Sequence, residues 1–403
     1  MQRPPVPPGR PTPVGASSGA RDVIVVGAGV IGAAVAWRAA TRGLAVTAVD
    51  PEPGRGSSWA AAGMLGPVSE VQFGEEALLE LNLAAARAWP AFATELESVL
   101  GGRSIGYRRS GTLVVAAEPG DAAIAADLHA FQGSLGLESE WLEPRRAREL
   151  EPGLAPGIRA GLWAPGDHQV DNRRLMIGLL EAAGSAGATI RRAAVAGIVT
   201  AGGRVTGVRL SDDTVLDAPT VVLAAGCHSA SVAGLPGHAS PPVRPVKGQI
   251  MRLFGPTTPP VLSRIVRGVV HGASVYLVPR ADGEVVVGAT VEERGFDDTV
   301  TAGALYELLR DAHRVVPGVT ELVVGETMAA LRPGSPDNAP IVGPTDVDGL
   351  VVATGHYRNG ILLAPVTADA VVDLVTGSGL PSSMACFAPG RFAVGAAGGG
   401  GPH

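Results

Sequence analysis

The sequence predicts an α/β protein in two parts, one built on a parallel sheet and the other an α+β part built on an antiparallel sheet. A strand–turn–helix–strand unit of about 30 residues, the size of a βαβ unit, begins at residue 21. Strand patterns dominate residues 243–291 and are separated by turns that contain Gly or Asp. Segments of the two kinds alternate along the chain, so each part is predicted to combine separate stretches of sequence.

The first unit carries the parallel part. Residues 23–26 are continuously apolar, which is typical of a strand buried on both faces. Residues 31–42 are rich in Ala and free of Pro, and Gly43 follows where a C-cap glycine belongs, so a helix is predicted there. A second strand is predicted over residues 44–49, and Asp50 closes it.

The remaining elements follow from periodicity and from the positions of Gly and Pro. Helices are predicted over residues 75–100, 121–132, 144–150, 172–184, 302–314 and 361–374, with Pro90 as a break or first-turn residue in the first of them. Strands are predicted over residues 112–116, 220–224 and 349–354, and within 185–208 and 243–291.

Composition excludes several classes of protein. The 403 residues are 46% apolar and 17% charged, with 32 basic and 38 acidic residues and a net charge of −6. Without a basic excess, a nucleic-acid partner is not predicted. Two cysteines, Cys227 and Cys386, cannot form a disulfide framework of the secreted kind, which favours a cytoplasmic location. No apolar run reaches the roughly 18 to 20 residues that a membrane span requires.

Both ends of the chain have biased composition. Residues 1–20 are rich in Pro, Gly and Ser and lack the apolar segment of a secretory signal, which predicts a disordered tail. Residues 386–403 end in a run of Gly and are predicted to form a flexible tail.

Gly27, Gly29 and Gly32 form a GxGxxG pattern. With 56 Gly in the chain, chance alone gives about one such match, so the context decides its meaning. The pattern follows a predicted strand, opens a predicted helix, and precedes Asp50 by about 20 residues, which is the dinucleotide-binding arrangement. The glycines permit the tight turn, the approach of a pyrophosphate and close helix packing, while Asp50 would accept from ribose hydroxyls and disfavour NADP. A Rossmann-like domain is therefore predicted.

Three later segments favour FAD over NAD. The run SSWAAAGML over residues 57–65 consists mostly of small residues, which would let backbone amides approach a planar ring. A predicted strand, VVLAAG, ends at Gly226. Residues 351–360 read as a strand, a turn and a helix start, and the helix N-terminus near Gly360 would face the ring where charge develops on reduction.

With these motifs in place, the sequence resembles the flavin-dependent amine oxidases of the D-amino-acid oxidase superfamily, and most closely its bacterial glycine oxidase branch, which serves thiamine biosynthesis. The motifs VIVVGAGVIG, SSWAAAGMLG, RPVKGQ, YLVPR, ALRPGSPDNAPIVG and GHYRNGILLAP occur in the family's order over residues 21–380. The resemblance implies an FAD-binding domain of residues 21–102, 149–243 and 333–385. It also implies a substrate domain of residues 103–148 and 244–332, whose antiparallel sheet faces the flavin.

The resemblance also implies site residues. Arg332 of the LRPG motif would bind the substrate carboxylate through its planar fork of donors, with Tyr276 and Arg358 beside it. Structural roles stay open for these three: an ion-paired Arg332, a half-buried strand Tyr276 and a structural Arg358. The positions implied for FAD are Gly27, Gly29, Val30, Ile31, Gly32, Asp50, Pro51, Ser57, Ser58, Ala62, Gly63, Met64, Val195, Gly226, His356, Tyr357, Arg358, Asn359, Gly360, Ile361 and Leu362.

Two departures from relatives bear on the cofactor. Monomeric sarcosine oxidases attach FAD through a cysteine, and neither Cys227 nor Cys386 falls at that place, so noncovalent FAD is expected. Those oxidases also carry a lysine in the strand that matches EVVVGAT, whereas the only lysine here is Lys247 in RPVKGQ. The reaction with oxygen is therefore assigned to no residue. No pair of histidines has metal-ligand spacing, and no metal site is predicted.

The reaction that the resemblance implies is oxidation of glycine by hydride transfer to FAD. The imine would be hydrolysed to glyoxylate and ammonia or passed to thiazole synthesis for thiamine, and oxygen would be reduced to hydrogen peroxide. Three alternatives stay open: a D-amino-acid or sarcosine oxidase, a dehydrogenase that reduces a quinone, and a flavoprotein module of a larger complex. A homo-oligomer is also left open.

Overall fold

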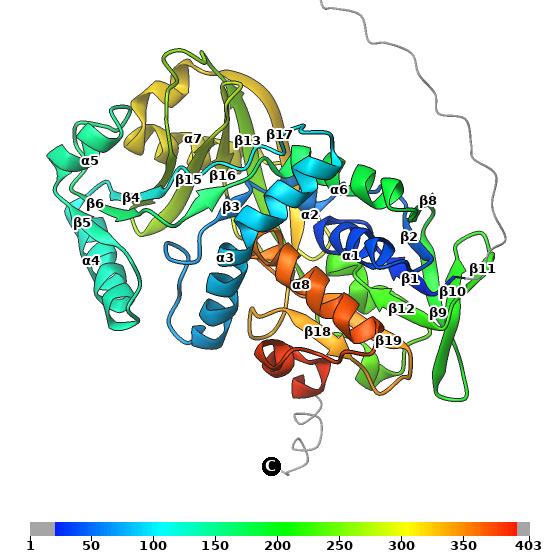
Figure 1. Ribbon diagram of the computed structural model, residues 1–403. Coiled ribbons are helices and arrows are strands. Elements are labelled where there is room, and N and C mark those ends of the chain that lie inside the picture. Colours follow the sequence, from blue (N-terminus) through cyan, green and yellow to red (C-terminus); the bar gives the residue numbers. More distant parts are fainter. Residues whose placement is uncertain (1–20, 393–403) are drawn as a thin grey trace, which may run out of the picture.

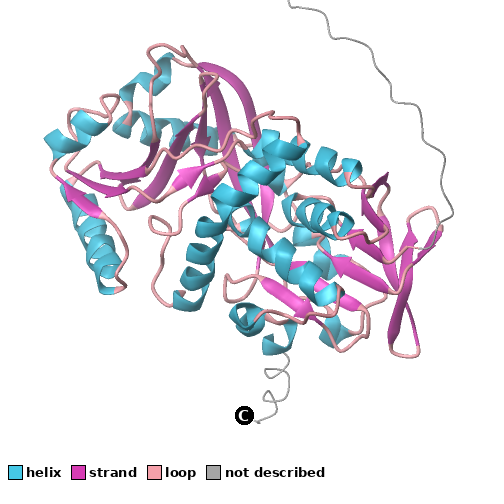
Figure 2. Ribbon diagram, in the orientation of Figure 1, coloured by secondary structure: helices cyan, strands magenta, loops and turns pink. Residues whose placement is uncertain are grey.

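The structure is a computed structural model that describes residues 21–392 (Figure 1). The predicted tail at 1–20 and the last residues of the predicted tail at 386–403 lie outside the described residues. Figure 2 shows the strands gathered in two regions, with helices packed between and around them. No helix formed by residues 21–392 is long and apolar enough to cross a bilayer.

Over these residues the predicted elements are present, with ends that shift by a few positions. The helices are α1 (Val30–Thr41), α2 (Ser57–Ala60), α3 (Glu76–Val99), α4 (Pro119–Ser134), α5 (Pro144–Leu150), α6 (Asn172–Ser185), α7 (Ala302–Val315) and α8 (Gly360–Val375), with 3-10 turns at η1 (Gly226–Ser231), η2 (Gly237–Ala239), η3 (Pro317–Glu321) and η4 (Ser382–Phe387). The strands are β1 (Val23–Val26), β2 (Val46–Asp50), β3 (Met64–Leu65), β4 (Thr112–Ala116), β5 (Glu140–Leu142), β6 (Ala160–Ala164), β7 (His168–Gln169), β8 (Thr189–Arg192), β9 (Val195–Ala201), β10 (Arg204–Leu210), β11 (Val215–Asp217), β12 (Thr220–Leu223), β13 (Arg244–Phe254), β14 (Ile265–Val270), β15 (Ala273–Pro279), β16 (Glu284–Gly288), β17 (Val323–Gly334), β18 (Ile341–Pro344) and β19 (Leu350–Thr354).

A six-stranded sheet carries the predicted βαβ unit. Its order is β18-β19-β12-β1-β2-β8, and only β18 runs antiparallel to its neighbour. Val23 and Val25 of the central strand pack under α1, α3, α6 and α8, whereas Ile24 and Val26 pack against the three-stranded sheet β11-β10-β9. Both faces of β1 are therefore buried, which explains its continuous apolar sequence.

An eight-stranded sheet forms the second part, in the order β17-β13-β16-β15-β14-β4-β6-β5. It is antiparallel except for the pair β14 and β4. One face is covered by α7, whose Leu308, Ala312 and Val315 are buried in that core. The other face, with Ile250 and Val286, packs against Ala60 at the end of α2 and Ala62 of the loop that follows. The two-part α/β fold class predicted from the sequence is confirmed.

Details differ from the prediction in two places. Pro90 lies inside a continuous α3 and does not break it, because Trp89 and Phe92 are buried against the neighbouring helices and hold both sides of the proline in place. β6 falls within the 149–243 stretch that was predicted for the FAD-binding domain, yet it pairs with β4 and β5 in the eight-stranded sheet. Leu162 is fully buried there, so packing decides where the strand belongs.

The first residues of the predicted C-terminal tail are ordered. Phe387, the last residue of η4, is 2% exposed and belongs to the core between the six-stranded sheet and helices α1, α3, α6 and α8. Arg391 forms an ion pair with Asp337, 2.8 Å from Nε to Oδ2. Local composition does not indicate such long-range contacts, so the Gly-rich end of the chain led to the prediction of a flexible tail.

Candidate active site

A cavity of about 1580 Å³ lies where the two sheets meet. Its walls include the carboxyl ends of β1, β2, β12 and β19, the loop at 56–64, and residues of β13, β15 and β17. Ligands of doubly wound proteins bind outside the carboxyl ends of parallel strands, so the position of the cavity agrees with the dinucleotide fingerprint.

The glycines of the fingerprint are required by close backbone approaches. Gly27 has φ +99°, and a Cβ there would lie 2.4 Å from the carbonyl oxygen of Ala224. A Cβ at Gly32 would lie 2.0 Å from the carbonyl oxygen of Gly27. The turn therefore packs directly against β12 and α1 and leaves the helix N-terminus open to the cavity.

Asp50 is fixed at the end of β2 by two backbone donors. Its Oδ2 accepts from the amide of Ala28 at 2.7 Å, and its Oδ1 accepts from the amide of Glu52 at 2.8 Å. Each carboxylate oxygen keeps a further lone pair for a ribose hydroxyl. Nearby, Ser58 Oγ accepts from the amide of Val30 at 3.0 Å, which links the start of α1 to α2.

The start of α8 is shaped by the turn before it. Tyr357 has φ +46°, and its amide donates to the carbonyl of Pro333 at 3.0 Å. His356 is 2% exposed, and its Nε2 lies 3.0 Å from Thr367 Oγ1. Burial lowers the pKa of His356 to about 3, so its imidazole is too weak a base to take up a proton near pH 7 and is no candidate for a catalytic base.

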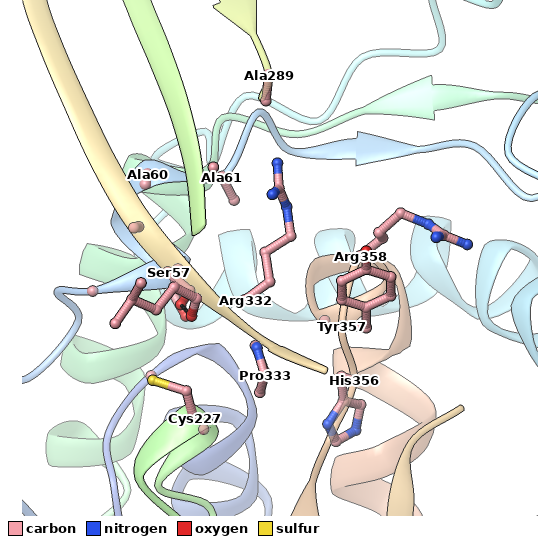
Figure 3. Close-up of a pocket in the computed structure, with 18 of the residues that line it drawn as sticks. Ser57, Ala60, Ala61, Cys227, Ala289, Arg332, Pro333, His356, Tyr357 and Arg358 are labelled. Carbon is pink, nitrogen blue, oxygen red and sulfur yellow. Dashed lines mark hydrogen bonds between the residues drawn. The ribbon is translucent and has the colours of Figure 1, made fainter. Parts of the chain in front are cut away.

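Arg332 extends from β17 into the cavity (Figure 3). Its Nη1 donates to the carbonyl of Thr290 at 3.1 Å and to the carbonyl of Lys247 at 3.3 Å. Within residues 21–392, Nε and Nη2 form no hydrogen bond. One edge of the guanidinium is therefore anchored, and the other can pair with a carboxylate.

Tyr276 lines the same cavity from β15. Its ring and hydroxyl lie against Gly288, where a Cβ would be 2.4 Å from Oη. Burial raises the pKa of the Tyr276 hydroxyl, and Arg332 partly opposes this effect. The hydroxyl is therefore protonated at neutral pH and can donate to an anion.

Arg358 has a different environment from Arg332. Its Nη2 lies 3.1 Å from Glu75 Oε2, and its guanidinium lies 4.8 Å from the ring centre of Tyr357. Figure 3 shows its guanidinium directed away from that of Arg332. The ion pair with Glu75 is what a structural role of Arg358 would require. Arg358 nevertheless also borders the cavity.

A family model described as "DAO: FAD dependent oxidoreductase" matches residues 22–374. The chain belongs to this family. It is 36% identical over 377 residues to the "Bifunctional protein ThiO/ThiG" of Synechocystis sp.. The match covers 92% of this chain and 54% of that protein, so the chain spans about half the length of this relative. It is 35% identical to the glycine oxidase of Geobacillus kaustophilus, covering 88% of the chain and 92% of the relative. It is 30% identical to hydrogen cyanide synthase subunit HcnC of Pseudomonas aeruginosa, covering 92% and 96%.

Solved structures agree with these sequence relatives. The crystal structure of glycine oxidase from Geobacillus kaustophilus superposes with a TM-score of 0.84 at 33% identity and covers 92% of this chain and 98% of that one. The glycine oxidase of Bacillus cereus gives a TM-score of 0.80 at 30% identity, covering 89% and 95%. This chain is thus an FAD-dependent oxidoreductase with the fold of glycine oxidases.

The described residues fit FAD. The glycine turn at 27–32 opens towards the cavity, Asp50 keeps carboxylate lone pairs that could accept from a ribose hydroxyl, and the amides of Ala62 and Gly63 have no partner within residues 21–392. Cys227 lines the cavity, but burial raises the pKa of its thiol to about 11, so it is protonated at neutral pH. This supports the expectation that FAD is held without a covalent bond.

Most residues predicted to contact FAD line the cavity of the oxidoreductase, Met64 and Val195 among them. Three do not. Gly32 serves helix packing, as described above, while Asn359 is the N-cap residue of α8. Leu362 is 2% exposed in the helix core, and its carbonyl accepts from Trp89 Nε1 at 2.8 Å. Direct roles of individual residues in FAD binding stay predictions.

The sequence did not single out an ion pair that lines the cavity near Tyr276. Arg267 Nη1 donates to Glu70 Oε1, and the two side chains are 17% and 15% exposed. Arg267 lies opposite Tyr276 in the register of β14 and β15. The two partners are 197 positions apart in the chain and carry no motif, so no local signal could have found them.

Proposed function

We propose that this oxidoreductase oxidises glycine to an imine that is hydrolysed to glyoxylate and ammonia, with oxygen as the electron acceptor. The single observation that carries the proposal is Arg332, whose free guanidinium edge faces a cavity shared with Tyr276. The similarity to glycine oxidases of two organisms supports the same substrate.

Arg332 and Tyr276 would bind the substrate carboxylate through charge-assisted hydrogen bonds and thereby orient the α-carbon. FAD, when bound, accepts the hydride that leaves this carbon. The amine must be neutral for its lone pair to assist, and the neighbouring Arg332 lowers the pKa of the substrate ammonium group. His356 is neutral and already bonded to Thr367, so we assign no side-chain base.

We propose a role in thiamine thiazole biosynthesis for the same reaction. Its support is the 36% identity to a bifunctional ThiO/ThiG protein, of which this chain spans 54%. The imine would then pass to the thiazole-forming reaction before hydrolysis. A cytoplasmic location would suit such a pathway.

The test is an anaerobic mixture of the FAD-loaded protein with glycine, followed by the visible absorption band of oxidised flavin. We expect rapid bleaching that Arg332→Ala slows by about 100-fold or more, because two charged hydrogen bonds to the carboxylate are lost. Arg209→Ala is the matched control, since Arg209 of β10 pairs with Asp213 at the surface and does not border the cavity.

The outcomes separate the candidate substrates and products. An unbleached flavin with glycine, but bleaching with D-alanine, D-proline or sarcosine, would exclude glycine and favour the broader amine oxidases. Bleaching without oxygen uptake would favour a dehydrogenase. Assays for glyoxylate, ammonia, peroxide and cyanide would distinguish a glycine oxidase from an enzyme of the HcnC kind.

A further inference from the structure

Two buried arginines lie behind the cavity wall formed by the loop after α2. Arg252 of β13 is 1% exposed, and Arg280, which follows β15, is 6% exposed. Both face Glu284: Arg252 Nη1 lies 2.8 Å from Glu284 Oε2, and Arg280 Nε lies 4.0 Å from the same oxygen. The two guanidinium groups thus share the carboxylate of Glu284.

Asp171 and Asp282 add two carboxylates beside Arg280, and Arg174 adds one more guanidinium group. Asp171 pairs with Arg174, 3.2 Å from Oδ2 to Nε, and Asp282 also pairs with Arg174 at the surface. Burial lowers the pKa of Arg280 to about 10, which still leaves its guanidinium protonated at neutral pH. The three arginines and three carboxylates therefore balance in number, and the two buried guanidinium groups of Arg252 and Arg280 remain charged behind the cavity wall.

The arginines hold the carbonyl oxygens of the loop. Arg280 Nη2 donates to the carbonyl of Ala62 at 2.6 Å, and Arg252 Nη2 lies 3.5 Å from the carbonyl of Ala61. Asn172 Nδ2 donates to the carbonyls of Ser58 and Trp59 at 2.9 Å. Each of these carbonyls points away from the cavity and into the cluster.

A trans peptide unit places its carbonyl oxygen and its N–H on opposite sides. The N–H groups of Ala62 and Gly63, which share peptide units with the carbonyls of Ala61 and Ala62, therefore point towards the cavity that both residues line. Within residues 21–392, neither N–H has a hydrogen-bond partner. Buried amides without a partner are costly, which indicates that a ligand satisfies them.

Gly63 fixes the direction of these donors. It has φ +69°, and a Cβ there would lie 2.0 Å from the carbonyl oxygen of Val170. Its own carbonyl accepts from the amide of Val170 at 2.9 Å. The loop is thus held from both sides, and the two donors keep their orientation without a ligand. Figure 3 shows the neighbouring Ala60 and Ala61 on the cavity wall.

We propose that Arg252 and Arg280 are positioning residues that aim the N–H groups of Ala62 and Gly63 at bound FAD and raise its reduction potential. Reduction adds negative charge to the flavin, and two aligned peptide dipoles with charged guanidinium groups behind them stabilise that charge in a medium of low dielectric constant. The arginines act through the loop and do not need to touch substrate.

The test is the midpoint potential of FAD in the full-length, FAD-loaded protein, measured by equilibration with a reference dye in the absence of any amine. We expect Arg280→Met, which removes one positive charge, to lower the potential, and Glu284→Gln, which removes the negative charge, to raise it. Each change should alter the ratio of reduced to oxidised FAD by about tenfold or more at fixed potential. Arg280→Lys keeps the charge and should remain near the wild-type value.

Arg174→Met is the matched control, because Arg174 lies beside the cluster, is 48% exposed and donates to no carbonyl of the loop. The potential of Arg174→Met should shift less than that of Arg280→Met, because solvent screens the charge of a half-exposed side chain. Equal potentials for the wild type, Arg280→Met and Glu284→Gln would overturn the proposal and leave the arginines a purely structural role. If Arg280→Met does not fold, Glu284→Gln and Arg280→Lys still decide the outcome.

The inference rests on FAD binding and not on the proposed glycine oxidation, because the potential is read without substrate. The potential could change as expected in Arg280→Met and Glu284→Gln while glycine fails to bleach the flavin. That result would reject only the proposed function. Bleaching by glycine with no change in potential across the series would reject only this inference.

Discussion

The guanidinium group of Arg332 lies against the backbone of Gly248. A Cβ built at Gly248 would be 2.3 Å from Nη1 and 2.4 Å from Nη2 of Arg332. The two residues belong to paired strands, β13 and β17, in which Arg332 itself lies opposite Val246. The glycine of the RPVKGQ segment thus provides the space that the guanidinium group of Arg332 occupies.

Gly248→Ala is expected to displace Arg332 and to raise the KM for glycine by about tenfold or more, since even a small misplacement weakens a bidentate contact. FAD content should be unchanged. Gly184→Ala in α6 is the control, because a Cβ there has no heavy atom within 4 Å. Steady-state kinetics and flavin absorbance check both variants, and an unaltered KM in Gly248→Ala would contradict the expectation.

Tyr276→Phe tests the second donor to the carboxylate. Loss of one neutral hydrogen bond should raise the KM for glycine by about three- to tenfold, with a smaller effect than Arg332→Ala. Because burial raises the pKa of Tyr276, its ionisation should contribute no step to the pH profile of kcat/KM below the usual range of tyrosine. A neutral or alkaline step that disappears in Tyr276→Phe would show that the hydroxyl ionises during the reaction.

Arg358 is expected to act mainly through its ion pair with Glu75. The side chains are 23% and 13% exposed, so Arg358→Met and Glu75→Gln should each lower the free energy of unfolding by on the order of 1 kcal/mol. In a double-mutant cycle, the double variant should cost less than the sum of the two single variants. Denaturant unfolding measures this coupling.

Kinetics separates the two roles of Arg358. If the ion pair is its main role, Arg358→Met should raise the KM for glycine by less than about tenfold. A rise as large as that of the Arg332 variant, with no loss of stability, would instead place Arg358 on the substrate.

Asp167 is expected to make stability depend on pH. Its carboxylate is fully buried and accepts from the amides of Val68 at 3.1 Å and Ser69 at 2.6 Å, beneath the turn that carries Glu70. Burial raises the pKa of Asp167 from 3.8 to about 6. The native state therefore binds the Asp167 proton more tightly than the unfolded chain does. The stability that protonated Asp167 contributes is present below pH 4 and is lost as the pH rises through about 6.

The difference in unfolding free energy between wild type and Asp167→Asn should fall by about 3 kcal/mol from pH 4 to pH 7, since each unit of pKa shift corresponds to about 1.4 kcal/mol. Denaturant titrations at several pH values measure it. Comparison of the two proteins cancels the contributions of other carboxylates. A difference that is constant over this range would mean that Asp167 titrates near its ordinary pKa.

The dinucleotide turn could be predicted because its physics is local. Gly27, Gly29 and Asp50 lie within one βαβ unit, and the glycine positions follow from backbone conformation and close approach. Arg332 was assigned through its motif by resemblance to the family, whereas the carbonyls that anchor it, those of Lys247 and Thr290, come from other segments of the chain. Local spacing likewise indicated the limits of most helices.

Charge partners could not be predicted, because they join distant segments. Nothing in the sequence separates Arg358, held by Glu75, from Arg332, whose free edge faces the cavity. Similarly, β6 joined the eight-stranded sheet because its buried side chains packed there, although its place in the chain suggested the other domain.

The sequence by itself determined the two-part α/β fold and the cofactor class through motifs of residues close together in the chain, and its resemblance to the family singled out Arg332. Only the tertiary structure decided which of the many arginines are anchored, which are free and which lie buried behind the cavity wall, as Arg252 and Arg280 do. Those states depend on burial and on partners that folding brings together, and burial sets the strength of every charge in the site.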